Sequence, residues 1–330
     1  MEFIQKHFTL TYLTENVYKI EDQKRLRKSD MKAMLLCAGY GRRLRPLTLR
    51  RPKVLVPVSN IPVLLRNIKY IKRYGFDEVI INCHHLRDQL IDFLEDLDIE
   101  GIRIEISIEE SILGTGGGIK KAEWFFSDEP FLVINGDILT DIDLKDVFKV
   151  HSHSDSLATM VIQRYPKFNQ IEIDSEGFVR EISKEHKKGL YAFTGVHILD
   201  PKALEYIPKA KFYSIIDCYR GILKRGGKIK AYTAEGHYWF DIGTINSYID
   251  ANRFFLNEKK VLIGERCKIS SDLTIEEWAC IGDECTIEED VSVGRSIIWE
   301  RVHIKREITL KDCIITDNNV IWQDLYGKIV

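Results

Sequence analysis

Apolar positions along residues 31–150 follow two alternating patterns: short runs or period-two stretches, and stretches of helical spacing. The runs predict buried or half-buried strands over 34–37, 79–81, 102–108 and 131–134. The helical spacing predicts helices over 61–71, 86–94 and 119–126. Because strands and helices alternate, we expect an α/β fold with a doubly wound, Rossmann-like mixed sheet. Its ligand site should lie at the carboxyl ends of the strands.

Residues 151–256 continue this domain in a less regular order. Strands are predicted over 158–162, 171–174, 191–199 and 229–232, and a helix over 215–224. A further helix, over 244–256, is the natural linker to the last part of the chain. The first large domain is therefore expected to span residues 31–256.

Residues 257–330 change to a period of six, with apolar residues at positions i and i+2. One apolar column runs through 261, 267, 273, 279, 285, 291 and 297, and a second through 263, 269, 275, 281, 287 and 293. One residue then drops out, and the period resumes at 302, 308, 314 and 320. This pattern predicts a parallel β-helix of hexapeptide repeats. An irregular β-sandwich would not keep one period over so many steps.

Residues 1–30 combine apolar side chains with a basic run over 24–28, and we interpret them as an N-terminal extension whose role the sequence does not assign. A length of 330 residues fits two further domains. The net charge of −2 provides no overall basic field, which argues against nonspecific nucleic-acid binding as the main activity.

Seven cysteines form no Cys-x-x-Cys pair and mostly lie in apolar runs. This usage favours buried thiols in a reducing cytoplasm. No apolar stretch approaches the roughly 18 residues of a membrane span, and no signal-peptide pattern is present. We therefore expect a cytoplasmic protein that does not insert into a membrane.

Residues 34–58 carry the most informative chemistry, because a buried strand leads there into a glycine turn and a basic loop. The turn is Gly39-Tyr40-Gly41, and Arg42, Arg43, Arg45 and Lys53 follow. Glycines let backbone N–H groups approach an anion, and arginine offers a fork of donors to phosphate oxygens. The alternative is a plain tight turn, since two glycines alone are weak evidence. No Gly-Lys-Ser/Thr follows, so the loop is not a P-loop.

Two aspartates also follow predicted strands, Asp137 in Asn-Gly-Asp and Asp241 in Trp-Phe-Asp-Ile-Gly. Each alone could be a turn-capping carboxylate. Beside a phosphate loop they predict a Mg²⁺ site, because Mg²⁺ prefers one or two carboxylates plus substrate phosphates. The glycine-rich segment 114–118 is either a flexible connection or a place of close backbone approach to a ligand.

The histidine pairs His84-His85 and His151-x-His153 lack a Cys or a third His at ligand spacing. Solvated or helix-capping histidines are favoured over a metal site. On composition alone, Lys184 would be a surface charge.

These blocks together resemble the sugar-1-phosphate nucleotidylyltransferase family, in particular its mannose-1-phosphate guanylyltransferases. Residues 36–53 are similar to the family motif G-x-G-T-R-L-x-P-L-T-x-x-x-P-K, and the blocks at 115–118, 135–137, 193–199 and 239–244 follow in the family's order. The repeat region is similar to the left-handed β-helix that many members carry. The resemblance covers residues 31–330 and implies a nucleotidyltransferase domain followed by that β-helix.

Position by position, the resemblance implies four groups of site residues. Arg43, Lys53 and Asp137 would be catalytic, and Asp137 and Asp241 would bind Mg²⁺. Lys184 and Gly195 would contact the sugar phosphate. The nucleotide would be bound by Cys37, Ala38, Gly39, Gly41, Arg42, Arg43, Gly114 and Gly116. Two departures from the family stand out: Arg42 replaces a threonine, and a Ser-Lys-Glu block at Lys184 replaces Glu-Lys-Pro.

The implied reaction joins an NTP and a sugar 1-phosphate, with GTP and mannose 1-phosphate favoured, and a homo-oligomer is expected because β-helix edges invite a partner. A uridylyltransferase for another sugar 1-phosphate is one alternative. A catalytically silent paralogue that binds nucleotide sugar is another, although the arginine, lysine and both aspartates are kept. A bifunctional enzyme with an acyltransferase β-helix is a third, although the repeats contain only His303.

Overall fold

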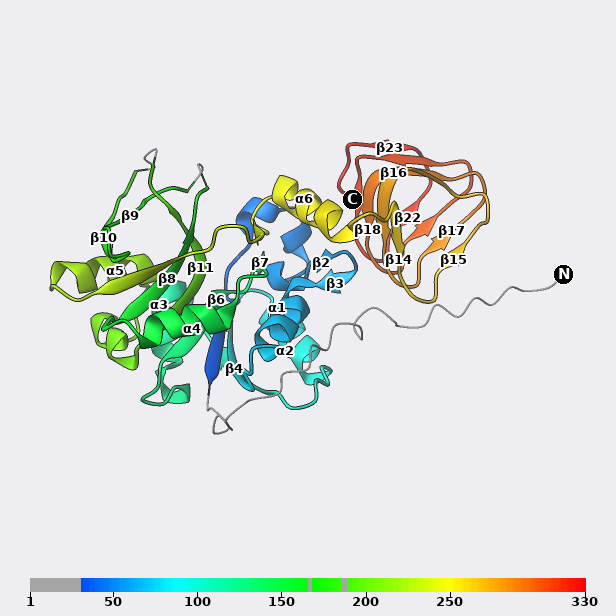
Figure 1. Cartoon of the computed structure of the whole chain (residues 1–330). Helices are drawn as coiled ribbons and strands as arrows, with labels where there is room; N and C mark the ends of the chain where they lie inside the picture. Colours follow the sequence, from blue (N-terminus) through cyan, green and yellow to red (C-terminus); the bar gives the residue numbers. More distant parts are fainter. Residues whose placement is uncertain (1–30, 166–167, 186–188) are drawn as a thin grey trace, which may run out of the picture. The chain divides into compact units, whose positions relative to one another are not determined.

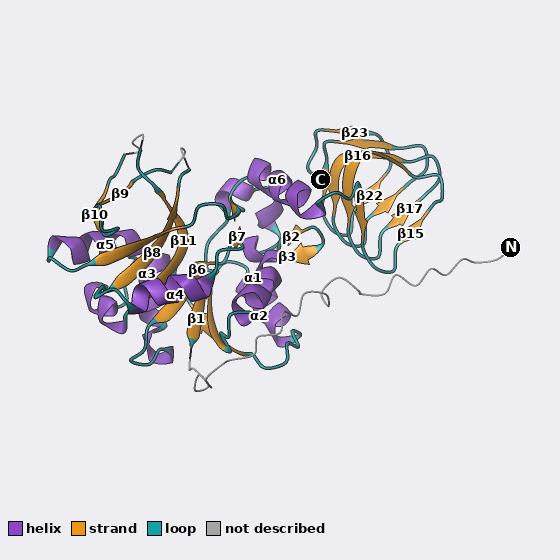
Figure 2. Ribbon diagram, viewed as in Figure 1, coloured by secondary structure: helices purple, strands orange, loops and turns teal. Residues whose placement is uncertain are grey.

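A seven-stranded mixed sheet forms the centre of the part of the chain that precedes the repeat region (Figures 1 and 2). The computed structural model describes residues 31–165, 168–185 and 189–330, so the expected extension 1–30 lies outside the described residues. The strands stand in the order β12-β8-β11-β6-β1-β4-β5. Their bounds are β1 (Lys32–Leu36), β4 (Glu78–Cys83), β5 (Arg103–Ile108), β6 (Phe131–Asn135), β8 (Ala158–Gln163), β11 (Ala192–Leu199) and β12 (Ile229–Thr233).

Strand β11 runs antiparallel to both neighbours, whereas the other adjacent pairs are parallel. The chain runs from β1 outward to β4 and β5, and then returns to place β6 on the other side of β1. The switch point of the doubly wound sheet therefore lies between β1 and β6. The predicted fold class is confirmed.

Helices cover both faces of this sheet. One face packs against α1 (Val63–Lys72), α2 (Arg87–Glu95) and α4 (Leu144–Ser152), and the other against α3 (Gly114–Lys121) and α5 (Ile215–Lys224). Leu35 of β1 belongs to the first apolar cluster and its neighbour Met34 to the second. Because both faces are buried, the strand shows a continuous apolar run rather than an alternation.

Short elements complete this part, and the pattern predicted two of their strands, the one over 171–174 and the one that leads to Asp241. Two-stranded antiparallel pairs join β2 (Pro57–Val58) to β3 (Ile61–Pro62), β9 (Ile171–Ile173) to β10 (Val179–Ile182), and β7 (Ile138–Thr140) to β13 (Trp239–Asp241). Five 3₁₀ helices lie at Arg42–Leu44, Leu47–Leu49, Lys53–Leu55, Glu123–Phe125 and Pro201–Tyr206. None of the helices in the described ranges is long and apolar enough to cross a membrane.

Helix α6 (Ile245–Leu256) leads to the repeat region and begins with a capping box, in which Thr244 and Ser247 bond each other's backbone N–H groups. The strands after it pair in parallel, coil on coil, as predicted for a β-helix. They are β14 (Val261–Ile263), β15 (Lys268–Ile269), β16 (Thr274–Ile281), β17 (Thr286–Ile287), β18 (Ser292–Ile298), β19 (His303–Ile304), β20 (Thr309–Lys311), β21 (Ile314–Ile315), β22 (Val320–Ile321) and β23 (Leu325–Tyr326).

The predicted column positions 297, 314 and 320 are wrong by one residue. The coil shortens earlier than the period suggested, because the register shifts between Glu276 and Ala279, so that Ala279 pairs with Ser296. Ser296, Cys313 and Asn319 therefore take the places expected for positions 297, 314 and 320, and Ile298 and Ile321 continue the second column in the interior. The period alone could not locate the missing residue, since apolar residues stand on both sides of it.

Ile297 and Ile314 belong instead to an apolar column that faces outward, in which residues of successive coils pair with one another. The column consists of Leu262, Cys280, Ile297, Ile314 and Ile329. It packs with Tyr248 of α6, Trp278, Trp299 and the 44–58 segment in a single cluster. One face of the β-helix is thus buried against α6 and the 44–58 segment.

Candidate active site

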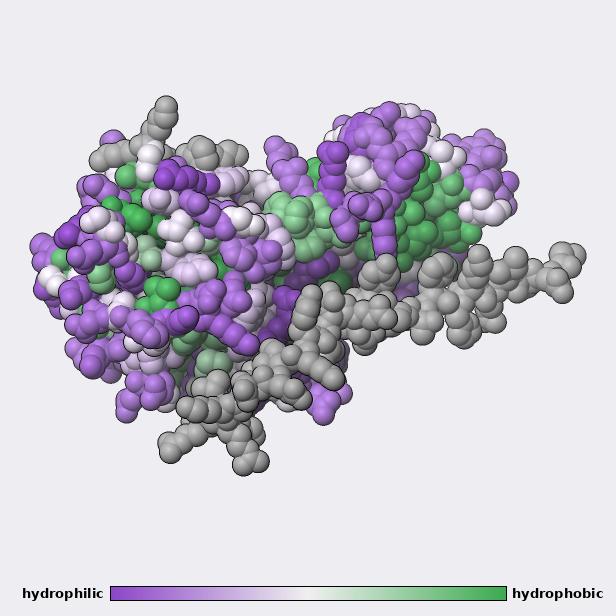
Figure 3. Space-filling model, in the orientation of Figure 1, coloured by the Kyte–Doolittle hydropathy of each residue, from purple (hydrophilic) through white to green (hydrophobic). Residues whose placement is uncertain are grey.

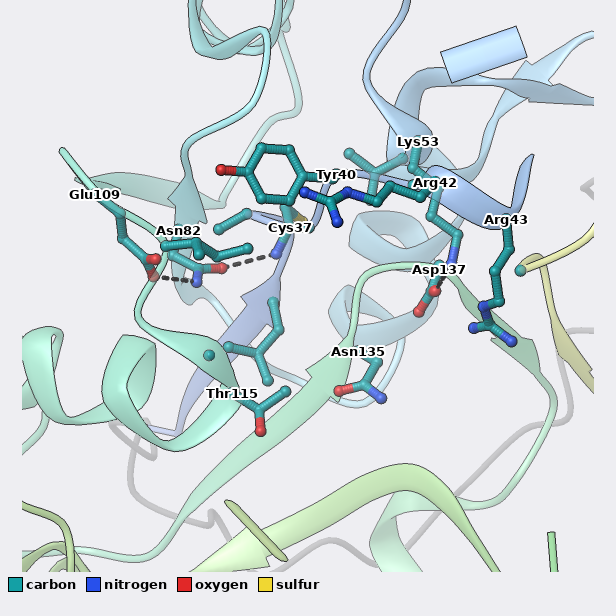
Figure 4. A pocket seen from close by; sticks show the side chains of 18 residues that line it. Cys37, Tyr40, Arg42, Arg43, Lys53, Asn82, Glu109, Thr115, Asn135 and Asp137 are labelled. Atoms are coloured by element: carbon teal, nitrogen blue, oxygen red, sulfur yellow. Dashed lines mark hydrogen bonds and ion pairs between the residues drawn. The ribbon is translucent and has the colours of Figure 1, made fainter. Parts of the chain in front are cut away.

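The loops that follow β1 and β6 meet at the switch point of the sheet and line a cavity of about 390 Å³ (Figure 4). Binding sites of doubly wound sheets lie at this position. The lining residues are Leu36, Cys37, Ala38, Gly39, Tyr40, Gly41, Arg42, Arg43, Lys53, Val54, Asn82, Glu109, Ile112, Gly114, Thr115, Asn135, Asp137 and Gly243.

Two glycines of the loop after β1 serve different purposes. Gly41 has φ of +62°, and a Cβ there would lie 2.8 Å from Thr48 Cγ2. The Thr48 hydroxyl donates to Gly41 O at 2.8 Å, which fixes this turn before the 3₁₀ helix Arg42–Leu44. A Cβ on Gly39 would meet nothing within 4 Å. Because Gly39 lines the cavity, its missing side chain leaves room for a ligand beside the backbone.

Four charged side chains gather where β7 and β13 pair. Lys53 Nζ donates to Asp137 Oδ2 and lies 3.8 Å from Asp241 Oδ1. The Arg43 guanidinium is 3.6 Å from Asp241 Oδ2. The aspartates come together because Asp241 pairs with Ile138, and Ile242 N donates to Asp137 O at 3.0 Å. The sequence predicted all four residues for the site.

The two carboxylates have a donor set that suits a divalent cation. Asp241 Oδ1 is buried and receives no hydrogen bond from the described residues. Burial, and next the charge of Asp137, raise the pKa of Asp241. No group of three His, Cys, Asp or Glu side chains suited to a metal occurs among the described residues, so a cation here would need substrate oxygens as further ligands. Mg²⁺ is bound in this way in many phosphoryl-transfer sites.

A buried polar network closes the other end of the cavity. Asn82 Oδ1 accepts from Cys37 N at 2.7 Å, and Asn82 Nδ2 donates to Glu109 Oε1 at 2.7 Å. Glu109 Oε2 accepts from Leu113 N at 2.9 Å. The sequence interpretation missed both side chains. Asn82 ends the run of β4 and Glu109 follows β5, so the strand-end rule that found Asp137 would have found them.

The glycine-rich segment forms the first turn of α3, so its interpretation as a flexible connection is wrong. Gly114 and Thr115 line the cavity. Gly116 instead packs against the backbone of Ser214 and Ile215, where a Cβ would approach within 3.1 Å. The nucleotide contact of Gly114 stays a prediction for a residue that lines the cavity, whereas Gly116 serves the packing of α3 on the segment before α5.

Arg42, which replaces the family's threonine, stacks on a tyrosine. Its guanidinium carbon is 4.9 Å from the centre of the Tyr40 ring, and the Tyr40 hydroxyl is 3.2 Å from His84 Nε2. His84 Nδ1 in turn lies 2.8 Å from Glu109 O, and His85 Nε2 is 3.3 Å from Thr48 O. The two histidines therefore brace the wall of the cavity.

The two residues predicted for the sugar phosphate are not among the residues that line the cavity. Gly195, at φ of +81°, has no room for a Cβ beside the Asn135 side chain, which lines the cavity. Lys184 is exposed, and its carbonyl accepts from Gln170 Nε2 at 3.2 Å. In the β-helix, His303 Nε2 is 2.8 Å from Glu288 Oε1.

A cavity at the switch point that combines a glycine–arginine loop, a lysine and two aspartates defines a class of enzymes that handle nucleoside triphosphates. The chain belongs to the nucleotidyl transferase family, whose model matches residues 32–258. The model of the GMPPB C-terminal domain matches residues 257–326. The family resemblance and the enzyme class predicted from the sequence are confirmed, and members of the family typically use a divalent metal.

Relatives with known names span almost the same length. The chain is 30% identical to mannose-1-phosphate guanylyltransferase 1 of Arabidopsis thaliana, over 90% of this chain and 88% of that protein. It is 27% identical to the UTP–glucose-1-phosphate uridylyltransferase of Synechocystis sp., over 82% and 83%. The crystal structure of HddC from Yersinia pseudotuberculosis complexed with GMP-PN matches with a TM-score of 0.59 and 28% identity, over 68% of this chain and 99% of that chain. The chain is accordingly a sugar-1-phosphate nucleotidylyltransferase.

Proposed function

We propose that the protein transfers GMP from GTP to mannose 1-phosphate, which yields GDP-mannose and pyrophosphate. The observation that carries this proposal is the cavity itself, in which Lys53 stands between two aspartates at the end of an open glycine–arginine loop. The guanylyltransferase names of the Arabidopsis relative and of the C-terminal family model favour guanine and mannose.

In the proposed reaction a phosphate oxygen of the sugar 1-phosphate attacks the α-phosphorus of the NTP, and the bond to the pyrophosphate breaks on the opposite side. The nucleophile is already an anion, so the residues need not remove a proton. They must bring two anions together and neutralise the charge that develops. The Gly39–Gly41 backbone and Arg43 would hold the triphosphate, and Lys53 would neutralise charge at the reacting phosphorus.

Asp137 and Asp241 would hold the Mg²⁺, whose chemistry is to neutralise phosphate oxygens. Before substrate enters, Lys53 binds Asp137, so its ammonium must leave that carboxylate to reach a phosphate. Arg43, whose side chain is 60% exposed, can turn from Asp241 to the triphosphate without desolvation. The proposed roles of Gly195 and Lys184 toward the sugar phosphate remain predictions.

The test is a matrix of four NTPs against a panel of sugar 1-phosphates, read by pyrophosphate release with Mg²⁺ and with a chelator. We expect the highest rate with GTP and mannose 1-phosphate, and loss of the rate with the chelator. A preference for UTP would favour the uridylyltransferase alternative, which the Synechocystis relative supports. Tight binding of nucleotide sugar without pyrophosphate release from any NTP would refute catalysis and favour the silent paralogue.

We further propose a homo-oligomer. Strands β22 and β23 stand at the edges of their sheets, where unpaired backbone groups can accept a partner. Figure 3 shows hydrophobic residues gathered on the visible face of the β-helix, and exposed apolar side chains of this region include Ile263, Val320 and Val330. Light scattering during size-exclusion chromatography should give a mass above 38.4 kDa, the mass of one chain. The cytoplasmic location remains a prediction from the cysteine usage.

A further inference from the structure

Arg51 connects the lysine loop of the active site to the β-helix. It lies two positions before Lys53, but its side chain is turned away from the cavity that Arg42 and Arg43 line. Its guanidinium forms a bidentate ion pair with Glu300, with Nη1 3.3 Å from Oε2 and Nη2 bonded to Oε1. Nη2 is also 3.4 Å from Asp317 Oδ1.

This contact is shielded from solvent. The side chain of Arg51 is 18% exposed, and those of Glu300 and Asp317 are 24% and 28% exposed. The guanidinium also stacks on Trp299, with its carbon 4.6 Å from the ring centre. A bidentate, stacked arginine fixes both the direction and the distance of the groups it joins, which a point charge does not.

The stacking partner is itself fixed to the same loop. Trp299 Nε1 donates to the Tyr248 hydroxyl at 2.9 Å, and that hydroxyl donates to Pro57 O at 2.7 Å. The β-helix therefore contacts the loop at both ends, through the guanidinium at Arg51 and through α6 at Pro57. Lys53 lies between these two points.

The chain between Arg51 and Lys53 is too stiff to absorb a displacement. Pro52 restricts its own φ, and its carbonyl accepts from Leu55 N at 2.9 Å at the start of the 3₁₀ helix Lys53–Leu55. A shift of the Arg51 backbone would therefore move the backbone of Lys53, which carries the ammonium. Misplacement of a catalytic group by about 1 Å can cost about a hundredfold in rate.

We propose that Arg51 is a positioning residue for the transfer reaction, and that the coils carrying Trp299, Glu300 and Asp317 form part of the scaffold that places Lys53. The proposal rests on the role given to Lys53 in the proposed function. In this arrangement the β-helix sets the geometry of the reacting centre. A partner or ligand that displaces these coils would consequently change turnover.

The test compares Arg51→Met, Glu300→Gln and the double variant with wild-type protein by steady-state kinetics of pyrophosphate release. We expect kcat to fall by about ten- to a hundredfold with little change in the KM for NTP, since Arg51 binds neither substrate. The double variant should be no slower than Arg51→Met, because both changes remove the same contact. Arg51→Lys should restore only part of the rate, because an ammonium cannot form the bidentate pair.

Arg295→Met provides the matched control. Arg295 also forms a bidentate pair, with Asp312 at 2.6 Å, but both residues lie on the surface of the β-helix. Its kcat should equal that of wild type. An unchanged kcat in Arg51→Met, or an equal fall in Arg295→Met, would overturn the proposal. If Arg51→Met does not fold, Glu300→Gln decides in the same way, because it keeps the side-chain shape.

Hydrogen exchange of the peptide 44–56 tests the positioning without turnover. The Arg51→Met and Glu300→Gln variants should exchange faster in this peptide, and Arg295→Met should not. If wild-type protein releases no pyrophosphate from any NTP, the proposed function fails while faster exchange still supports the connection to the loop. Unchanged exchange in both interface variants would refute the connection itself.

Discussion

Replacing Lys53 by methionine should destabilise the metal-free protein, because its ammonium lies between two carboxylates and is the ion-pair partner of Asp137, whereas Asp241 also has Arg43. Lys53 Nζ binds Asp137 and lies 3.8 Å from Asp241 Oδ1. The three side chains are 12%, 20% and 22% exposed, so solvent screens them only in part. Methionine keeps most of the length of the side chain and removes only the charge.

The size of the effect follows from the distance and the burial. Two unit charges about 4 Å apart attract by about 4 kcal/mol at an effective dielectric constant of about 20. Removing one member of a buried pair typically costs about 3–5 kcal/mol, because the remaining charge is left uncompensated. For a domain of this size each kcal/mol lowers Tm by about 2–4 °C, so a fall of about 6–20 °C is expected.

The assay is thermal unfolding of the full chain in the absence of metal. Adding Asp137→Asn to Lys53→Met should recover part of the lost Tm, because it removes one of the two repelling charges. Lys120→Met is the control, since the Lys120 side chain is equally buried at 9% exposure but its partner Glu123 is 43% exposed. Such a pair contributes about 0–1 kcal/mol.

A second experiment measures the change in Tm when Mg²⁺ is added. Mg²⁺ should raise the Tm of Lys53→Met more than that of wild type, because the variant leaves Asp137 uncompensated beside Asp241, which keeps only Arg43 at 3.6 Å. A Lys53→Met protein that melts within about 2 °C of wild type, under the conversion used above, would refute the role of Lys53 as the counter-ion. An equal response to Mg²⁺ in both proteins would contradict the placement of the cation at Asp137 and Asp241.

Three further predictions concern other parts of the site. Gly39→Ala should leave Tm unchanged and raise the KM for NTP, because the added Cβ would contact only the space of the cavity. Gly41→Ala should instead lower the free energy of unfolding by about 1–2 kcal/mol, because alanine disfavours the φ of +62° at this position. Glu109→Gln should cost about 1–3 kcal/mol in urea unfolding, because one of the two N–H donors facing its carboxylate would meet an NH₂ group. Burial alone would raise the pKa of Glu300, but the bonds and charge of Arg51 outweigh it and the pKa is lowered. Its stabilisation is therefore complete above the unfolded pKa and is lost as the pH falls through the lowered folded value, and Glu300→Gln should remove that acid-side loss of Tm.

The sequence predicted the elements whose buried faces give a regular pattern of apolar residues along the chain. The apolar runs of β1, β4 and β6 and the hexad columns of the β-helix follow directly from which faces are covered. The strand-end rule, together with the family motif, brought Arg43, Lys53, Asp137 and Asp241 to one place. The pairing of β7 with β13, which joins these aspartates, was not predicted, because the three-residue β7 is too short to show a period and the strand at Asp241 does not reveal its partner.

Other features depend on tertiary contacts that a local pattern does not contain. The start of α3 at Gly114 is one example, since Gly116 N and Gly117 N both donate to Tyr213 O from a distant segment. The outward column is another, because apolar triplets such as Ala279-Cys280-Ile281 do not show which residue faces the interior. The role of Arg51 required the β-helix to be seen beside the loop.

The apolar column on the β-helix has a consequence for how the interface is specified. Because Leu262, Cys280, Ile297 and Ile314 repeat at one register, this surface looks nearly the same after a translation by one coil. Hydrophobic contact alone would therefore stabilise this interface about equally well in two alignments that differ by one coil. The acidic position that pairs with Arg51 repeats as well, since Asp283, Glu300 and Asp317 share one register. Trp299 does not repeat, because the neighbouring coils carry Gly282 and Thr316 at its register. Its indole, which stacks on Arg51 and donates to the Tyr248 hydroxyl, therefore selects a single alignment from a repeating surface.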